Sequence, residues 1–279
     1  MVRFLMAILG VLLSLGAHAE VLVAVPQDVL NDYQRLVAER KVEDIRDYRG
    51  AGSRRDTVEV ILFQQALRLG GYQQRIQFVP VDSYQRNLVE VENGRVLATA
   101  TTVWAADVKD SAAKKSNAMI QDGEYVVGFY VAASNRALQS ADLKRLQTLS
   151  AVSNQNWKND LAVLDSLDIR RIQTAPTFPM IAKMVAAGHG DFTLASFKSA
   201  PDMRYEIDGV RLLPVRGLKV AMPGSRHFLV APSPEGERLR AALDKGIMQL
   251  RQEGRIRRAY TDAGFFNSKV ESWRLLNQK

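Results

Sequence analysis

Small hydroxyl side chains end two short apolar segments that lie far apart in this sequence. Thr101 and Thr102 close the segment VLATATT, whereas Thr193 and Ser196 belong to the segment DFTLAS. A helix-like stretch with a glycine stop precedes each segment. In open α/β sheets, ligands bind outside the carboxyl ends of the strands. If both segments are such strands, their hydroxyl groups face each other across a cleft and can hydrogen-bond a polar ligand.

Two adjacent arginines, Arg54 and Arg55, precede the first clearly periodic helix. A cation at a helix start opposes the helix dipole, so this placement hints at a use. At the mouth of a cleft the pair would bind an anion, and we favour Arg55 for that role. The alternative is that both are solvated residues at the start of a surface helix.

Amide and aromatic side chains lie at other expected element ends. Asn156 and Trp157 stand at a predicted helix start, where free backbone N–H groups attract anions. Trp157, Trp104 and Tyr125 can stack on a flat ligand. Packing inside the protein is the alternative role for these three aromatic residues. We expect Thr177 to cap a helix first and to contact a ligand second.

The residue types that most catalysis and metal binding need are scarce. The chain has no cysteine, which excludes disulfides, thiolate metal sites and a cysteine nucleophile. Beyond the first twenty residues the only histidines are His189 and His227, and nothing in the sequence places them together. Asp191 is expected to be structural, at the turn before its strand. The sequence therefore predicts no catalytic residue, no cofactor and no bound metal.

The charge balance is basic, with 38 Lys and Arg against 30 Asp and Glu and a formal net charge of +8. Such a balance first suggests a nucleic-acid partner. However, the positive residues are scattered, and the densest cluster, RQEGRIRRAY, also fits the solvated face of a terminal helix. We expect no nucleic acid. Attraction to an anionic ligand or to a membrane surface stays open.

The first residues have the layout of a cleavable secretory signal. Arg3 precedes the apolar run Phe4 to Leu15, and the small residues Ala17 to Ala19 end before Glu20. The apolar run is shorter than the ~18–20 residues that a membrane span needs. We expect residues 1–19 to be a signal peptide, cleavage after Ala19, and a location in the periplasm.

Hydrophobic periodicity predicts alternating strands and helices. In the first half, the strands are VLVAVP, IQFVPV and VLATATT, and the helices are DTVEVILFQQALRL, capped at Asp56 or Thr57, and SYQRNLVEVENG. The second half repeats the alternation with YVVGFYVAAS, LSAVS, IRRIQTA and DFTLAS as strands. This β–α–β order predicts an α/β fold with parallel sheets and helices on their faces.

The order of these segments resembles that of the extracellular solute-binding proteins of family 3, which have the type II periplasmic binding protein fold. The resemblance rests on the stretches VENGRVLATATTVWAADV, LQSADLKRLQTLSAVSNQNW, MIAKMVAAGHGDFTLAS and HFLVAPSPEGERLRAALDKGIMQLRQEGRIRRAYTDAG. It implies two lobes, each a mostly parallel sheet with helices on both faces, that close on a ligand about a hinge. Lobe 1 would comprise 20–125 and 226–279, and lobe 2 would comprise 126–225, with crossings near 125–128 and 222–226.

Two contacts that amino-acid binders of this family use are missing. These proteins carry an arginine shortly after the threonine pair to bind the carboxylate of the ligand, but here Trp104, Ala105 and Ala106 stand in that region. They also place an acid after the DFTLAS-like strand to hold the α-ammonium, and this chain has none there. With Arg55 as the only nearby fixed charge, we expect a weakly anionic or neutral, partly flat solute rather than a zwitterionic amino acid.

The resemblance implies a periplasmic, monomeric binding protein and not an enzyme. It would capture a small polar solute for a membrane permease or a membrane sensor. Two alternatives stay open: a structural or regulatory factor that has lost ligand binding, and a dehydratase-type enzyme, which would need a Glu or His in the cleft. The predicted ligand contacts are Arg55, Thr101, Thr102, Trp104, Tyr125, Asn156, Trp157 and Thr177.

Overall fold

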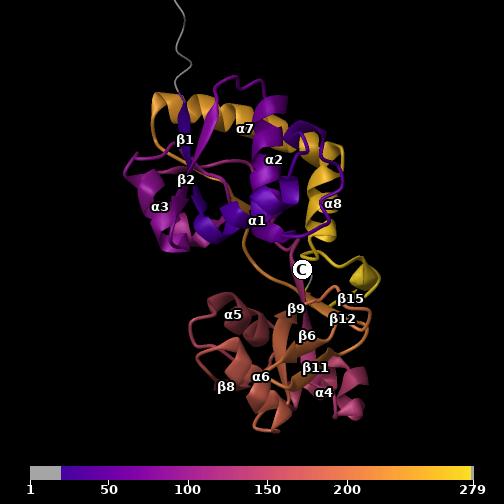
Figure 1. The fold of residues 1–279 in the computed structure, drawn as a ribbon. Coiled ribbons are helices and arrows are strands. Elements are labelled where there is room, and N and C mark those ends of the chain that lie inside the picture. Colours follow the sequence, from indigo (N-terminus) through magenta and orange to yellow (C-terminus); the bar gives the residue numbers. More distant parts are fainter. Residues whose placement is uncertain (1–19, 278–279) are drawn as a thin grey trace, which may run out of the picture.

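A computed structural model describes residues 20–277, and the expected signal peptide, residues 1–19, lies outside them. The described chain forms two lobes, each with its own sheet (Figure 1). The α/β, two-lobed architecture expected from the sequence is confirmed. Within residues 20–277, none of the helices combines the length and the apolar character needed to cross a bilayer.

Lobe 1 is built on a five-stranded sheet with the order β2-β1-β3-β14-β5. β1 pairs in parallel with β2 and β3, and β14 joins antiparallel to β3. A separate ribbon pairs β13 with β4. The strands are β1 (Val21–Pro26), β2 (Ile76–Val81), β3 (Ala98–Thr99), β4 (Val103–Trp104), β5 (Lys114–Lys115), β13 (Arg226–His227) and β14 (Leu229–Val230).

Two helices of lobe 1 pack unusually closely. α2 buries ten of its fifteen residues, and it lies against α7 with glycines at the contact. A Cβ atom at Gly246 of α7 would come within 1.9 Å of the Ala66 carbonyl oxygen of α2. The helical segments of this lobe are α1 (Gln27–Val37), η1 (Val42–Asp44), α2 (Arg55–Leu69), α3 (Tyr84–Glu92), η2 (Ala105–Val108), α7 (Pro234–Gln252) and α8 (Arg255–Asp262). The closest approach lies near the C-terminal end of α2 and fixes how this helix packs on α7.

Lobe 2 has a mixed sheet with the order β10-β11-β6-β9-β7-β8, in which antiparallel pairings outnumber parallel ones, unlike the mostly parallel sheet expected for this lobe. β7 pairs in parallel with β8 and β9, whereas β6 is antiparallel to β9, β11 and β12. The strands are β6 (Val126–Ala132), β7 (Ser150–Ser153), β8 (Arg171–Thr174), β9 (Phe192–Ser196), β10 (Tyr205–Ile207), β11 (Val210–Pro214) and β12 (Leu218–Ala221). The helical segments are η3 (Arg136–Ser140), α4 (Leu143–Gln147), α5 (Lys158–Ser166) and α6 (Phe178–Ala186).

The C-terminal segment differs from its expected place in lobe 1. η4 (Ser268–Val270) leads to β15 (Arg274–Leu275), which pairs in parallel with β12 of lobe 2 (Figure 1). The side chain of Asn277 then donates to the carbonyl oxygen of Ala221 and accepts from its N–H, each at 2.8 Å. A two-residue strand is too short to show a period in the sequence. The two crossings near 125–128 and 222–226 remain our proposal.

The observed helix starts agree in part with those predicted from the sequence. Thr177 caps α6, as expected, by accepting from the N–H of Met180. The expected cap of α2 at Asp56 or Thr57 is wrong, because α2 begins at Arg55 and its N-cap residue is Arg54, with no side-chain cap bond. Arg54 and Arg55 therefore occupy the N-cap and the first position of a helix that lacks a capping side chain.

Candidate functional site

A cavity of about 700 Å³ lies between the two lobes. This volume is in the range of sites that bind small molecules. Lobe 1 contributes Trp104, Ala106 and Asp107. The other lining residues are Tyr125, Val127, Asn156, Trp157, Lys158, Asn159, Asp160, Phe178, Leu194, Ala195, Ser196, Lys198, Tyr205 and Met222. We call this cavity the interlobe cleft.

The cleft contains four of the eight side chains predicted to contact a ligand. Trp104, Tyr125, Asn156 and Trp157 line it. The other four, Arg55, Thr101, Thr102 and Thr177, are not among its lining residues. Their surroundings explain why.

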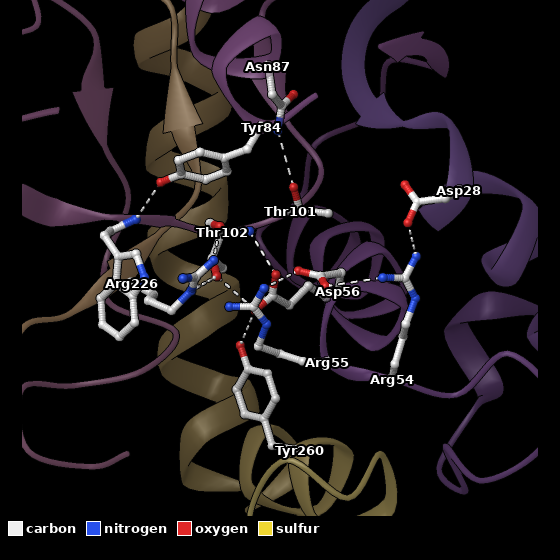
Figure 2. Close-up of polar contacts among 12 residues, drawn as sticks. Asp28, Arg54, Arg55, Asp56, Tyr84, Asn87, Thr101, Thr102, Arg226 and Tyr260 are labelled. Atoms are coloured by element: carbon white, nitrogen blue, oxygen red, sulfur yellow. Dashed lines mark hydrogen bonds and ion pairs between the residues drawn. The ribbon is translucent and has the colours of Figure 1, made fainter. Parts of the chain in front are cut away.

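Thr102 uses its polar groups inside lobe 1. Its N–H and its hydroxyl donate to the two carboxylate oxygens of Glu59 at 2.8 and 2.7 Å. The same hydroxyl accepts from Nε of Arg226 at 2.9 Å, and the carbonyl oxygen accepts from that guanidinium too. Figure 2 shows the side chains of Arg226 and Tyr260 directed toward Thr102. Only 1% of Thr102 is exposed, so it has little left to offer a ligand.

Thr101 and Thr177 also have partners within the protein. The hydroxyl of Thr101 is buried and accepts from Nδ2 of Asn87 at 3.2 Å. Thr177 is the capping residue of α6 and lies at the surface. The threonine pair therefore holds lobe 1 together, and does not form the cleft wall that the sequence pattern predicts.

Glu59 is the centre of a buried polar cluster that sequence reasoning missed. It has no exposed surface, and it also accepts from the hydroxyl of Tyr260 at 3.0 Å. Burial and the nearby Arg55 lower the pKa of Arg226, while Glu59 opposes that shift. Burial, followed by the charge of Glu59, raises the pKa of Tyr260 well above its usual value. We call Glu59, Thr102, Arg226, Tyr260 and Arg55 the Glu59 cluster.

Arg55 is directed into this cluster and not toward the cleft. Burial works against its charged form, but the attraction of Glu59 and Asp56 prevails, and the pKa of Arg55 is raised. Its guanidinium forms an ion pair with Asp56 and lies 5.6 Å from the ring centroid of Phe265. The expectation that Arg55 supplies the fixed charge of the ligand site is therefore not supported by its position.

One signal in the sequence could have revealed the cluster. Glu59 interrupts the apolar run VEVILF of α2. A carboxylate on a buried helix must find donors or cations, because burying it alone costs a great deal of free energy. Its partners Arg226 and Tyr260 come from distant parts of the chain, and the sequence pattern gives no sign of that pairing.

Three aromatic side chains form a connected surface on lobe 2, which we call the aromatic wall: Trp157, Phe178 and Tyr205. The ring centroids of Trp157 and Phe178 are 6.5 Å apart, and those of Phe178 and Tyr205 are 5.0 Å apart. The hydroxyl of Tyr205 also donates a hydrogen bond to the carbonyl oxygen of Ser196, with 2.8 Å between the two oxygens. The sequence singled out Trp157 but gave no reason to choose the other two.

The other aromatic residues of the cleft have one face already covered. Tyr125 stacks on Phe265 with 4.6 Å between ring centroids, and its hydroxyl is hydrogen-bonded to Ser196. The guanidinium of Arg226 lies 4.7 Å from the ring centroid of Trp104. Both residues are thus held in place, with their remaining surface directed to the cleft.

Four charged side chains line the cleft, and three of them have a contact with the protein. Asp107 accepts from the hydroxyl of Tyr84 at 2.7 Å, and Nζ of Lys158 donates to the Gln155 carbonyl oxygen at 3.2 Å. Nζ of Lys198 lies 4.5 Å from the ring centroid of Tyr205. The fourth, Asp160, has no ion-pair partner among residues 20–277, and burial raises its pKa to about 6.

Residues 20–277 contain no group of three or more His, Cys, Asp or Glu side chains placed to hold a metal ion.

Comparison with known proteins identifies the fold. Neither a protein-family model nor a curated protein sequence matches this chain. Among solved structures, the "probable amino-acid ABC transporter extracellular-binding protein ytmK" from Bacillus subtilis is similar, with a TM-score of 0.57 and 10% identity over 88% of this chain and 99% of that one. The VFT2 domain of BvgS from Bordetella pertussis has a TM-score of 0.52 and 14% identity over 92% of this chain and 94% of that domain.

The chain is shorter than one of the proteins it resembles. It spans 43% of the BvgS periplasmic domain, at 12% identity and a TM-score of 0.50 over 88% of its own length. Because all three identities are low, these likenesses show the fold alone. This chain has the two-lobed fold of periplasmic solute-binding proteins.

Proposed function

We propose that this protein is a periplasmic solute-binding protein that captures a small polar solute in the interlobe cleft. The observation that carries the proposal is the cavity of about 700 Å³, lined from both lobes by aromatic and polar side chains. In two-lobed α/β proteins, hinge closure around a ligand is a common mechanism. Closure would bring Trp104 and Asp107 of lobe 1 toward the aromatic wall of lobe 2 and exclude water.

The protein would bind its solute without altering it. The cleft holds two aspartates and no glutamate or histidine among its lining residues, so it lacks the Glu or His that a dehydratase-type mechanism would need. We propose a monomer that passes its solute to a membrane permease or reports it to a membrane sensor. A similar fold is found in a protein described as part of an ABC transporter and in BvgS domains, so the likeness does not choose between these partners.

A binding screen of the purified protein, residues 20–279, tests the proposal. Amino acids, organic acids, amines and nucleobases would be compared by thermal shift, and each hit would be measured by calorimetry. A ligand at about 100 times its Kd should stabilise the protein by ~2.7 kcal/mol. If no compound in any class shifts the melting temperature, the alternative of a factor that has lost ligand binding is favoured.

Replacing Trp157 with alanine tests whether the hit binds in this cleft. Trp157 lines the cavity and belongs to the aromatic wall. Loss of a stacking aromatic should weaken binding by ~1–3 kcal/mol. The matched control is Trp273→Ala, because Trp273 packs against Phe197 in lobe 2 and does not line the cleft. Equal affinities in wild type and Trp157→Ala would place the ligand elsewhere.

A further inference from the structure

The cations of lobe 1 that lie nearest the cleft are neutralised inside the protein. Arg226 is 4% exposed and donates to the hydroxyl and the carbonyl oxygen of Thr102, next to the buried carboxylate of Glu59. Arg55 is attracted by the same carboxylate and by Asp56. The N–H and the hydroxyl of Thr102 already donate hydrogen bonds to Glu59. Lobe 1 therefore presents no guanidinium to the cleft: its lining residues are Trp104, Ala106 and Asp107.

Lobe 2 presents a carboxylate to the cleft. Asp160 lies in the first turn of α5 and lines the cavity. No Lys, Arg or His side chain among residues 20–277 forms an ion pair with it. Burial disfavours its charged form, and a backbone N–H at the start of α5 compensates only in part, so a positive group beside it would be stabilising. Asp160 is thus a candidate counter-ion for a charged group that comes from outside the chain.

The aromatic wall already holds an ammonium group. Nζ of Lys198 lies 4.5 Å from the ring centroid of Tyr205, within the distance at which a cation is attracted by an aromatic face. Lys198 is an exposed side chain that lines the cleft, so a ligand can displace it. The chain itself provides an example of how an ammonium group binds this wall.

We propose that the interlobe cleft takes a small organic cation, with its ammonium group between the carboxylate of Asp160 and the aromatic wall, and its apolar body against Trp104 and Trp157. A carboxylate on the ligand is not required. The inference rests on the proposed function, since it names the class of solute that the cleft captures. It replaces the expectation of a weakly anionic or neutral solute, which took Arg55 as the only fixed charge near the cleft.

The formal net charge of +8 does not oppose this assignment. Charges separated by more than about 10 Å are largely screened at ordinary ionic strength. The groups that a bound cation meets are those lining the cleft, where Asp160 and Asp107 balance Lys158 and Lys198 in number. When Lys198 moves off the wall, the face of Tyr205 and the carboxylate of Asp160 are free to hold a positive ligand.

The test uses three compounds with the same ring and different head groups: phenethylamine, 2-phenylethanol and phenylacetate. Each is titrated into the protein, residues 20–279, by calorimetry at neutral pH. Benzyltrimethylammonium and spermidine extend the series to a quaternary ion and to a cation without a ring. We expect the cations to bind, with the ring-bearing ones tightest, and 2-phenylethanol and phenylacetate to bind at least about tenfold more weakly than phenethylamine.

Two variants locate the ammonium group. Asp160→Asn should weaken phenethylamine at least about tenfold and leave 2-phenylethanol unchanged. Lys198→Gln should strengthen binding of the cations, because it removes the competing ammonium from Tyr205. The matched control is Asp165→Asn, an exposed acid on the same helix that does not line the cleft. Thermal unfolding of each variant shows that it is folded.

Each result decides the proposal. Equal or tighter binding of phenylacetate or 2-phenylethanol would overturn the assignment of a cation. So would the failure of all the cations while another class from the broad screen binds, and in that case the solute-binding function stands. Failure of every compound in both experiments would overturn the proposed function as well. An affinity for phenethylamine that is unchanged in Asp160→Asn, or unchanged or weaker in Lys198→Gln, would overturn the placement of the ammonium group.

Discussion

At the scale of single residues, Glu59 determines how lobe 1 faces the cleft. Moving a carboxylate into a protein interior costs several kcal/mol unless donors and cations compensate it. Glu59 receives hydrogen bonds from the N–H and hydroxyl of Thr102 and from the hydroxyl of Tyr260. Arg226 and Arg55 supply the opposite charge. Thr102 and Arg55, which the sequence suggested for ligand binding, thus interact with a carboxylate of the protein itself.

We predict that Glu59→Gln strongly destabilises the protein. The variant keeps the shape of the side chain but leaves two guanidinium groups near a neutral amide in the interior of lobe 1. Leaving buried charges without their compensating partner typically costs about 3–5 kcal/mol. Denaturant unfolding of the variant and of wild type measures the loss. Glu92→Gln, at an exposed position on α3, is the control and should change stability by less than about 0.5 kcal/mol.

Asp160 gives the stability a pH dependence of defined sign. Burial raises its pKa from 3.8 to about 6, so between these values the folded state binds more protons than the unfolded state. The free energy of unfolding therefore falls as pH rises through this window, and it stays lower above pH 6. The cost at pH 7 is at most about 3 kcal/mol, from a shift of about 2 pKa units.

We predict that Asp160→Asn is more stable than wild type at pH 7 and equal to it near pH 4. The amide cannot ionise, so it avoids the cost that the carboxylate carries at neutral pH. Urea unfolding at both pH values makes the comparison, with Asp165→Asn as a control at an exposed site. A gain of the same size at both pH values would mean that packing and not ionisation is responsible.

At the scale of elements, the contact between α2 and α7 fixes the position of the Glu59 cluster. Glycines allow the two backbones to approach, because a Cβ atom at Gly246 would lie 1.9 Å from the Ala66 carbonyl oxygen and one at Gly70 would lie 2.0 Å from that of Ala242. Neither contact can be relieved by moving a flexible side chain, since both involve backbone atoms.

We predict that Gly246→Ala destabilises the protein by more than about 2 kcal/mol, since overpacking here must separate two helices. At an ordinary helix interior the same change is favourable by up to about 1 kcal/mol, so the sign is diagnostic. Thermal or denaturant unfolding measures the change. Lys245→Ala, one position earlier and exposed on the same helix, should be nearly neutral. A stabilised Gly246→Ala variant would contradict the close helix contact.

The elements that the sequence predicted well are those whose own residues determine them. The helix over DTVEVILFQQALRL and the strands VLVAVP and IQFVPV carry enough apolar residues to show their period, and Thr177 caps its helix by a local bond. β15 and the aromatic wall could not be predicted in this way. β15 has two residues, and Tyr205 and Phe178 meet only because β10 and α6 pack in one lobe.

In the candidate site, likewise, the sequence could not show which charged side chains pair with one another inside the protein. Asn156 and Trp157 were predicted from a helix start and Trp104 and Tyr125 as stacking residues, and all four line the cleft. The role expected of Arg55 depended on its having no internal partner. The partners of Arg55, Glu59 among them, become visible only when α2 is folded against the rest of lobe 1.

At the scale of the whole molecule, the cleft depends on how the two lobes are joined. Besides the two crossings expected from the sequence, the chain returns to lobe 2 through η4 and β15. The stack of Tyr125 on Phe265 and the two bonds between Asn277 and Ala221 lie along these connections. A ligand that touches both lobes favours the closed arrangement by its differential affinity for it.

We predict that a ligand bound in the cleft brings the lobes together by a distance that spin labels can measure. The chain has no cysteine, so labels attach only at introduced positions. Lys109→Cys in lobe 1 and Asp165→Cys in lobe 2 replace side chains that are 74% and 73% exposed. The distance between these labels should shorten by several ångströms when the compound with the largest thermal shift is added.

The pair Lys144→Cys and Asp165→Cys lies within lobe 2 and is the control, so the distance between its labels should not change. If the first pair also keeps its distance although calorimetry detects binding, the cleft is rigid, and capture occurs without hinge closure.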